Sequence, residues 1–308
     1  MLKYLVKRFF ITIPTLILIL LLTFILARSL PGDPITVMYG ELQPPPEVRE
    51  ALERELGLDK PIIIQFLLHI YRMMRGDWGR SIHTGIPTFE LIKEAFISTL
   101  ILTMTSILIA SSLGLLLSYL SITHYNTRAD KVIRVFSIAT FSFPVFWWGF
   151  ILILVFSVYL RLLPAGGKGG IEHLVLPSIT LATVNLGMIT RVSRAALLEV
   201  LMQDHVILAK AKGLDTKAIM LKHVIRNALI TIITIIGLRF GVLLGGAVIT
   251  ETVFAYPGMG KVIIDSIFSR DYPILIGGVF VASLAIMVVN IIVDLVYALL
   301  DPRVKVGG

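Results

Sequence analysis

Cysteine is absent from this 308-residue chain, and charged residues are scarce, at only 16% of the total. The lack of cysteine excludes a disulfide framework, a thiolate nucleophile and a cysteine-ligated zinc site. A soluble domain of this size carries roughly a quarter charged residues. Because 56% of the residues are hydrophobic and the mean hydropathy is +0.89, the composition excludes an ordinary cytosolic enzyme and a disordered chain.

The motifs of common hydrolytic and phosphate-binding sites are also missing. None of the six histidines belongs to an H-E-x-x-H pattern, and there is no G-x-S-x-G elbow. Gly167-Lys168 and Gly260-Lys261 lack the earlier glycine and the following Ser or Thr of a Walker loop. We therefore predict that the chain is not an enzyme and binds no metal or cofactor. Any energy for active transport then comes from a partner or an ion gradient.

Long apolar runs are what the sequence has in abundance. A hydrocarbon core about 30 Å thick is crossed by about 20 apolar residues in a helix. Six runs fit this length: Phe9 to Ala27, about Phe96 to Ile122, about Val135 to Leu160, Leu174 to Ile189, Ala228 to Thr250 and Ile274 to Leu300. The first is too long for the apolar region of a typical signal peptide. We therefore predict an all-α polytopic membrane protein with six transmembrane helices and both termini on one side.

The distribution of charge orients these helices. Taken whole, the formal net charge of +8 fits either a polyanion partner or asymmetry across a membrane. With the N-terminus inside, the inside segments carry 15 Lys and Arg and five acidic residues, whereas the outside segments carry 12 basic and 14 acidic residues. This bias follows the positive-inside rule, so we predict cytoplasmic termini and no nucleic-acid partner.

Residues 28 to 95 form an outside loop far longer than a connection between packed spans requires. Its pattern predicts a charged helix from Glu47 to Leu56 and a second helix that begins after Pro61 and closes near Gly76. In the second helix, apolar residues recur at helical spacing at Ile64, Leu67, Leu68, Tyr71 and Met74. This face is predicted to lie on the bundle or at the membrane interface, and the loop to act as a structural cap or in docking or gating.

The inside link, residues 190 to 227, is longer than its position between two spans requires. Asp204 can cap a helix that ends at Gly213, and a new helix begins near Asp215. The small residues Ala209, Ala211 and Gly213 would allow another surface to approach the backbone closely, and lysines surround them. Composition leaves two interpretations open: a docking surface for a partner, or a basic amphipathic helix on anionic lipid.

A third informative segment is the outside stretch from Glu251 to Pro273. Tyr256, Pro257 and Gly258 mark a tight turn, and the apolar residues that follow predict a short helix folded back on the bundle. Glu251, at the outer end of the fifth span, is either a solvated acid at the interface or part of an outer gate.

Three polar residues fall within the last two spans: Arg239, Asn290 and Asp294. Intramembrane polar residues are costly and face the bundle interior by default. Arg239 lies about 16 Å beyond Ala228, and Asp294 lies about 10 Å before Asp301, so antiparallel spans place them at one depth. We predict an Arg239 to Asp294 ion pair with Asn290 beside it, either structural or in contact with substrate.

A series of motifs along nearly the full length resembles one family, the membrane permeases of binding-protein-dependent ABC importers in the dipeptide, oligopeptide and nickel branch. The motifs are Pro31-Gly32-Asp33-Pro34, Gly76-Asp77-Trp78-Gly79-Arg80-Ser81, Gln203-Asp204-His205-Val206, Ala209-Lys210-Ala211-Lys212-Gly213-Leu214, His223 with Arg226-Asn227-Ala228-Leu229, Glu251-Thr252-Val253-Phe254 with Tyr256-Pro257-Gly258-Met259-Gly260, Arg270-Asp271-Tyr272-Pro273, and Asp301-Pro302-Arg303. In two departures from the pattern, His205 replaces a common Tyr, and Thr231 replaces a proline, which predicts a straighter start of the fifth span.

The resemblance implies that the inside link is the coupling region, which docks on a cytoplasmic ATPase. The coupling residues it implies are Asp204, His205, Ala209, Ala211, Gly213, Leu214, His223, Arg226 and Asn227. The outer gate or pathway is assigned to Glu251, Tyr256, Pro257, Gly258, Arg239, Asn290 and Asp294. The resemblance also implies one permease domain over the whole chain, with an extracellular helical insertion at 28 to 95, a core at about 96 to 300 and a coupling segment at 190 to 227.

The resemblance further implies alternating access driven by partners. These are a second homologous permease subunit, two ATPase subunits that bind ATP and Mg, an extracellular substrate-binding protein and the lipid bilayer, in the cytoplasmic (inner) membrane of a bacterium or archaeon. Peptides are the first expectation for the cargo, with nickel or oligosaccharides as alternatives. An ion-coupled secondary transporter is the rival mechanism, but such a carrier would show inverted repeats or a chain of carboxylates through the spans. A structural scaffold would tolerate changes in the inside link.

Overall fold

The computed structural model describes residues 2–29, 35, 44–56 and 59–300, and the named elements within them are all helices. The α-helices are α1 (Leu2–Ser29), α3 (Pro46–Leu56), α4 (Ile62–Met74), α5 (Thr88–Thr123), α6 (Arg128–Ser142), α7 (Val145–Leu152), α8 (Ile171–Leu201), α9 (Asp204–Ala211), α10 (Thr216–Ile219), α11 (Arg226–Leu244), α12 (Val248–Val253), α13 (Met259–Ser269) and α14 (Tyr272–Leu300). π-Helical turns at Ile153–Tyr159 and Met220–Ile225 continue α7 and join α10 to α11. The motifs at 31–34 and 301–303 lie outside the described residues.

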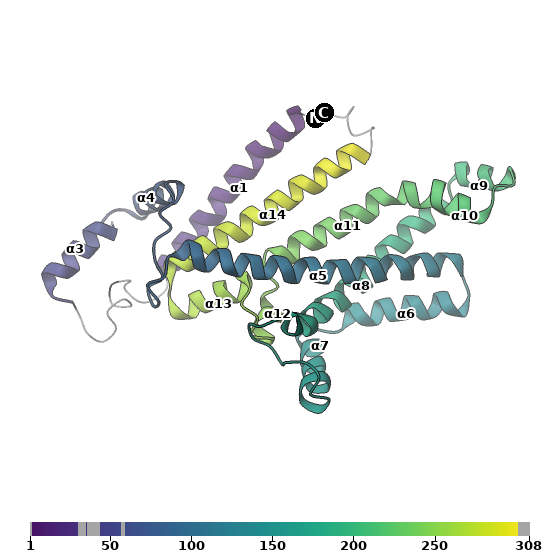
Figure 1. The fold of residues 1–308 in the computed structure, drawn as a ribbon. Coiled ribbons are helices and arrows are strands. Elements are labelled where there is room, and N and C mark those ends of the chain that lie inside the picture. Colours follow the sequence, from purple (N-terminus) through teal and green to yellow (C-terminus); the bar gives the residue numbers. More distant parts are fainter. Residues whose placement is uncertain (1, 30–34, 36–43, 57–58, 301–308) are drawn as a thin grey trace.

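Five described helical stretches are long and apolar enough to cross a membrane, and a sixth is formed if the bent pair of α6 and α7 is one span. This confirms the predicted all-α polytopic fold. Figure 1 shows the start of α1, the end of α14 and the helices α9 and α10 at the same end of the bundle, and α3, α4 and α13 toward the other. The stretch from α10 to α11 is one span without a break at Thr231, in line with the missing proline.

The third span differs from its prediction, which was one helix from Val135 to Leu160. The chain breaks after Ser142, and α7 leaves α6 at an angle of 97°. Pro144 has no N–H for the helix, and its ring forces the preceding Phe143 into an extended conformation, with ψ of 136°. The proline was visible in the apolar run, and it was the signal for this break.

The fourth span, predicted from Leu174 to Ile189, is a helix of 31 residues that extends to Leu201. It is the most buried of the spans, because α5, α6 and α11 pack around it. Some of its polar side chains bond within the helix, since Thr180 Oγ1 donates to Leu176 O and Asn185 Nδ2 donates to Leu181 O, each at 2.8 Å. A central helix can therefore be less apolar than one that faces lipid.

Glycines set the closest helix contacts. A Cβ at Gly187 of α8 would lie 2.3 Å from Thr140 Oγ1 and 2.5 Å from the Ser137 carbonyl oxygen of α6. α11 and α14 also pack closely, since a Cβ at Gly237 would lie 2.2 Å from Val293 Cγ2. Small residues four apart are typical of close helix packing in membranes. Gly237, Gly241 and Gly245 form this stripe and face Val293, Val289 and Ile286.

The glycine stripe explains why the predicted ion pair does not form. Among the ion pairs of the described residues, none joins Arg239 to Asp294. Arg239 lies two residues after Gly237, so its side chain leaves the helix far from the face that meets α14. Asn290 does approach α11, with its Oδ1 3.9 Å from a Cβ built at Gly241. The residue spacing places Arg239 and Asp294 at one depth, but it does not show which helix faces meet.

In the outer loop, α3 and α4 confirm the two predicted helices, but the predicted apolar face of α4 does not lie on the bundle. Ile64, Leu67, Tyr71 and Met74 are exposed, whereas Phe66 packs against Phe24 and Ile276. The membrane interface is the interpretation that remains. His69, on the inner side of α4, lies 5.8 Å from the Phe24 ring, and burial, with the charge of Arg28, lowers its pKa to about 4.

A larger side chain in the glycine stripe is expected to separate α11 from α14. Gly237→Leu places its Cβ inside the van der Waals radius of Val293, and overpacking of this kind costs about 1–3 kcal/mol or more. We expect a clear drop in thermal stability of the purified protein, measured by dye fluorescence or tryptophan emission. Thr231→Leu, at an exposed position of the same helix, is the control and should leave the melting temperature within error. Equal melting temperatures for both variants would contradict the packing.

Acid is expected to loosen α4. The pKa of His69 in the fold is about 4, below the value of about 6.5 for an unfolded histidine, so the unfolded form binds the proton more readily. The stability contributed by neutral His69 is complete above about pH 6.5 and falls as the pH approaches 4. The protection factors of residues 62–74, which divide the intrinsic exchange rate at each pH by the observed rate, should therefore fall between pH 7 and pH 5. His69→Phe, which keeps an aromatic ring, should remove this pH dependence, and an unchanged dependence would count against the assignment.

Candidate functional site at the coupling segment and the outer gate

The inside link folds as predicted into a short helix that ends before Gly213, but Asp204 does not cap it. The N-cap is Gln203, whose side chain makes no capping hydrogen bond, and Asp204 is the first helical residue. α9 begins at Asp204, and Gly213 follows its end with φ of 76°. Leu214 N donates to Ala209 O at 3.3 Å and Gly213 N donates to Lys210 O at 3.0 Å, which is the hydrogen-bond pattern of a Schellman motif. Asp215 then caps α10 by accepting a hydrogen bond from Lys217 N at 3.1 Å. The C-terminal end of α9 and the start of α10 are thus fixed by local interactions.

One side of α9 is buried, and this corrects the role predicted for Ala209. Val206 and Ala209 pack into a cluster with Val200, Met220 and Val224 from α8 and the start of the fifth span. Ala209 is therefore part of the core and cannot contact a partner. Its small size allows α9 to lie close to the bundle. Ala211, Gly213 and Leu214 are exposed, as predicted for a docking surface.

The exposed side of this region carries five large apolar side chains, of which only Leu214 was predicted as a coupling residue. They are Met202, Ile207, Leu208, Leu214 and Leu221, which we call the inner apolar patch. Lys210, Lys212, Lys217 and Lys222 are exposed around it. An exposed cluster of large apolar side chains with a polar rim is typical of a protein interaction site. The signal in the sequence was the amphipathic spacing of Ile207 and Leu208 opposite Val206 and Ala209.

The other predicted coupling residues lie beside α9. The His205 and His223 rings are 6.4 Å apart between centroids, and Asn227 Nδ2 lies 3.4 Å from His205 Nε2. Asn227 also donates to the His223 carbonyl oxygen at 2.6 Å. Asp204 and Arg226 are exposed on this surface. The structure therefore brings together His205, His223 and Asn227 from both ends of the link.

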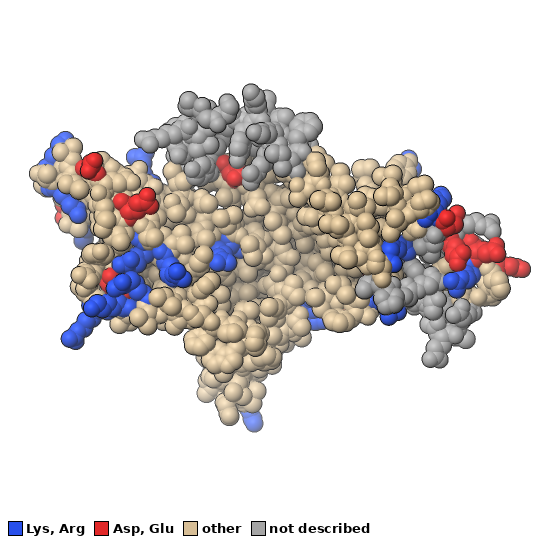
Figure 2. All heavy atoms as spheres, turned by 180° about the vertical axis from the view of Figure 1, so that it is seen from behind, with Lys and Arg blue, Asp and Glu red and all other residues tan. Residues whose placement is uncertain are grey.

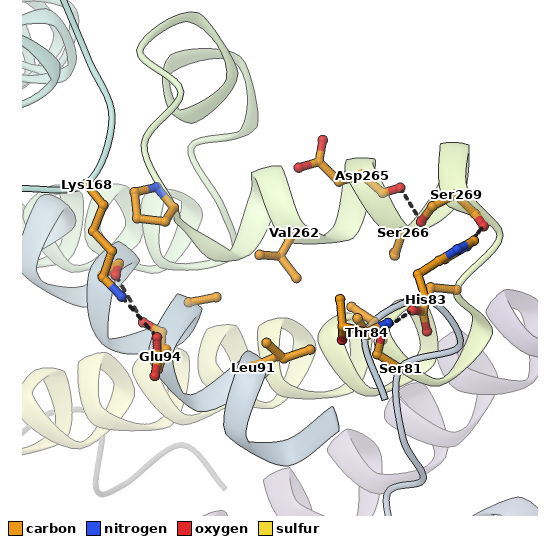
Figure 3. A pocket seen from close by; sticks show the side chains of 15 residues that line it. Ser81, His83, Thr84, Leu91, Glu94, Lys168, Val262, Asp265, Ser266 and Ser269 are labelled. Atoms are coloured by element: carbon orange, nitrogen blue, oxygen red, sulfur yellow. Dashed lines mark hydrogen bonds and ion pairs between the residues drawn. The ribbon is translucent and has the colours of Figure 1, made fainter. Parts of the chain in front are cut away.

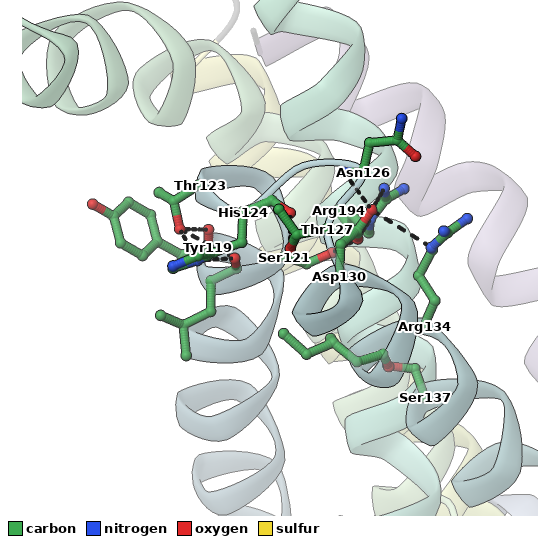
Figure 4. A network of polar contacts seen from close by, with 12 residues as sticks. Tyr119, Ser121, Thr123, His124, Asn126, Thr127, Asp130, Arg134, Ser137 and Arg194 are labelled. Carbon is green, nitrogen blue, oxygen red and sulfur yellow. Dashed lines mark hydrogen bonds and ion pairs between the residues drawn. The ribbon is translucent and has the colours of Figure 1, made fainter.

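A buried ion pair anchors this region to the bundle, and the sequence analysis missed it. Asp130 at the start of α6 accepts hydrogen bonds from Arg194 Nε and Nη2 of α8, each at 3.0 Å, and from Asn126 N at 3.2 Å (Figure 4). Ser121 of α5 donates to the same carboxylate. Asp130 is only 1% exposed. Bidentate Arg–carboxylate pairs fix geometry, so three spans are joined nearly three turns before α9 begins.

The predicted outer gate contains a buried carboxylate. Glu251 is 0% exposed, so it is not a solvated acid. Its Oε1 accepts from Thr99 Oγ1 of α5 at 2.7 Å, and its Oε2 accepts from Lys261 N at 3.0 Å. The Thr99 hydroxyl accepts from Met259 N at 2.7 Å. Glu251 and Thr99 together satisfy N–H groups in the first turn of α13, which no preceding residue caps.

The turn that was predicted beside Glu251 packs directly on it. A Cβ at Gly258 would lie 2.2 Å from Glu251 Cδ, so only glycine fits there. Tyr256 N donates to the Glu251 carbonyl oxygen at 2.8 Å, and Tyr256 Oη donates to Ser98 O at 3.2 Å. Burial raises the pKa of the Glu251 carboxyl, and the hydrogen bonds from Thr99 and Lys261 oppose that shift. Helix α13 is thus folded back on the bundle as predicted, and Glu251 holds it against α5.

A recess of about 320 Å³ opens between α13 and the start of α5, and Pro257 lines it. Figure 3 shows Lys168 and Glu94 facing each other at one side, with Nζ 3.1 Å from Oε2, and His83 at the other. His83 Nε2 donates to Ser269 O at 2.5 Å, and Ser81 Oγ donates to Asp271 Oδ2 at 2.6 Å. These contacts attach the outer loop, at the end of its Gly76 to Ser81 motif, to the corner between α13 and α14.

Loss of the Glu251 carboxylate is expected to release α13. Glu251→Leu leaves the Thr99 hydroxyl and the Lys261 N–H without an acceptor, and each unsatisfied buried group costs about 1–3 kcal/mol. We expect a lower melting temperature and faster hydrogen exchange in residues 259–269. Thr252→Leu, at the exposed neighbouring position, is the control. Exchange in 259–269 that matches the control would show that Glu251 does not hold the helix.

Comparison with known proteins places these features in a family. Residues 110–306 match the family of the binding-protein-dependent transport system inner membrane component, and residues 1–103 match the N-terminal family of the same membrane components. The chain is similar to the Di/tripeptide transport system permease protein DppB of Pseudomonas aeruginosa (38% identity), the Dipeptide transport system permease protein DppB of Escherichia coli K12 (35%) and the Glutathione transport system permease protein GsiC of E. coli K12 (36%). Each match covers 99% of both chains.

Solved structures show the same fold at low identity. A chain of an amino acid ABC transporter crystallised with histidines matches with a TM-score of 0.55 at 16% identity, over 68% of this chain and 94% of that one. A chain of the inward-facing MetNI methionine ABC transporter matches with a TM-score of 0.58 at 16% identity, over 70% of this chain and 98% of that one. The family models and the relatives at 35–38% identity show that the protein belongs to the family of inner membrane components of binding-protein-dependent transport systems.

Proposed function

We propose that this chain is the permease subunit of an ATP-driven ABC importer for short peptides, and forms half of the path across the cytoplasmic membrane of a bacterium or archaeon. Family membership implies an ATPase and other partners. The curated relatives are named for dipeptides, di/tripeptides and glutathione, which are all short peptides. These names favour a peptide over nickel or an oligosaccharide as the cargo.

The inner apolar patch is the observation that carries the coupling role. Its side chains are exposed at the end of the bundle where the charge bias places the cytoplasm, while Val206 and Ala209 on the other side of α9 are buried. In water this patch is costly to leave uncovered. A cytoplasmic ATPase subunit would cover it, and α9, packed on the bundle through Val206 and Ala209, would transmit the movement of that subunit to α8 and α11.

The remaining partners follow from the same mechanism. A second homologous permease subunit would complete the path, and two ATPase subunits would bind ATP and Mg, for which this chain has no motif. A substrate-binding protein would deliver the peptide to the outer mouth, near the loop fastened by Ser81 and Asp271. The permease domain would then comprise the outer insertion at 28 to 95, the core at about 96 to 300 and the coupling segment at 190 to 227, with both termini cytoplasmic.

A charge in the inner apolar patch tests the proposal. Leu208 is 56% exposed, so Leu208→Asp should leave folding and membrane insertion intact while placing an unpaired carboxylate in the interface with the ATPase. In proteoliposomes that contain the complete transporter, we expect ATP-dependent uptake of labelled alanyl-alanine to fall at least tenfold. Unlabelled di- and tripeptides should compete for uptake by the unmodified transporter, and free alanine should not.

Thr127→Asp is the matched control, because it places a carboxylate on the same side of the membrane at the N-cap of α6, where acids are tolerated. It should retain uptake. Normal uptake by Leu208→Asp would defeat the coupling role of the patch. If Leu208→Asp lowers ATP-dependent uptake as expected but unlabelled peptides do not compete for uptake by the unmodified transporter, the choice of cargo would instead be wrong.

A further inference from the structure

A recess of about 290 Å³ between α6 and α8 has no role in the mechanism above. Three arginines line it: Arg134 from α6, and Arg191 and Arg194 from α8. Among the described ion pairs, Asp130 is the one carboxylate that contacts them, with both oxygens bonded by Arg194 and one 3.6 Å from Arg134 Nε. One carboxylate against three guanidinium groups leaves the recess with two positive charges in excess.

The excess charge is concentrated on Arg191 and Arg134. Arg191 is exposed, its guanidinium carbon lies 5.9 Å from the centroid of the Phe141 ring, and no described carboxylate pairs with it. The Arg134 side chain is 46% exposed and shares Asp130 with Arg194. Both side chains can therefore bind an anion in the recess, while Arg194 is engaged in the buried pair.

The recess lies at the depth of the inner membrane interface. α6 begins at Arg128, directly after the α5–α6 turn, and Arg134 lies six residues, about 9 Å, further along the helix. Figure 2 shows Lys and Arg gathered at both ends of the molecule, with a nearly uncharged band between them. The positive-inside bias assigns this end to the cytoplasmic leaflet. Basic pockets between helices on this side of a membrane suit anionic lipid headgroups.

The outer face of α6 next to the recess is apolar. Val132, Val135, Phe136 and Ile138 are all exposed, and Ile138 also lines the recess. A basic recess joined to an apolar helix face matches a molecule that carries a phosphate and acyl chains. A free inorganic anion would gain nothing from the apolar face. We propose that the recess binds the phosphate of an anionic glycerophospholipid of the inner leaflet, with its acyl chains along α6.

The test compares lipid retention by the complete transporter and its variants. The transporter is purified from nanodiscs of phosphatidylcholine with a small fraction of phosphatidylglycerol, and the bound lipid is counted by native mass spectrometry. The double variant Arg134→Gln/Arg191→Gln should bind phosphatidylglycerol about thirtyfold more weakly, because each basic residue near an anionic surface contributes about a factor of five. The double lysine variant at the same positions keeps the charge and should retain the lipid.

Lys131→Gln is the matched control, since it removes one charge from an exposed position of α6 that does not line the recess. Its retention should equal that of the unmodified transporter. Three results would overturn the proposal: equal retention by the double glutamine variant; retention of inorganic phosphate, at millimolar concentration in pure phosphatidylcholine, that the double glutamine variant loses; or efficient cross-linking of Val135→Cys to the second permease subunit, which would place protein on this face. The test does not depend on the cargo.

Discussion

The close approach of α8 to its neighbours is the constraint on which the rest of the structure depends. α8 lies among α5, α6 and α11, and the backbone of α6 comes so near that a Cβ at Gly187 would meet the Ser137 carbonyl oxygen at 2.5 Å. In a bilayer there is little hydrophobic force between helices, so contact area and hydrogen bonds must hold them together. Glycine allows that contact here, and the same device joins α11 to α14.

Different interactions join the helices at the inner and outer ends of this packed unit. At the inner end, the Asp130–Arg194 pair joins α5, α6 and α8, and the chain continues into α9, whose C-terminal end is fixed by the turn at Gly213. Asp215 then caps α10. At the outer end, Glu251 and Thr99 hold α13 against α5. Both ends are thus rigid attachments to the spans. A force on α9 would therefore reach α8 and α11 without being absorbed by a flexible link, as an alternating-access permease requires.

The same inner region presents two chemically different surfaces. The inner apolar patch beyond the membrane surface offers an interface for a soluble partner, whereas the arginine recess between α6 and α8 faces the membrane interface. Arg194 belongs to both the structural pair and the recess lining. A lipid in the recess would therefore contact the pair that anchors the coupling region. This gives the bilayer a physical route by which it can stiffen the transporter.

The sequence by itself determined the all-α membrane fold and the C-terminal end of α9, because these follow from run length and from a glycine that acts within a few positions. The placement of charge predicts the orientation. The sequence also selected Glu251, Gly258, His205, His223 and Asn227 through the family resemblance.

Only the tertiary structure decided which faces meet. Arg239 and Asp294 share a depth, but the glycine stripe turns Arg239 away from α14. Ala209 is small because it is buried, and Ile207 and Leu208 are exposed. Asp130 and Arg194 are 64 residues apart and meet only because α6 packs on α8. Periodicity fixes a side chain's angle about its own helix, whereas its partner depends on how the helices pack.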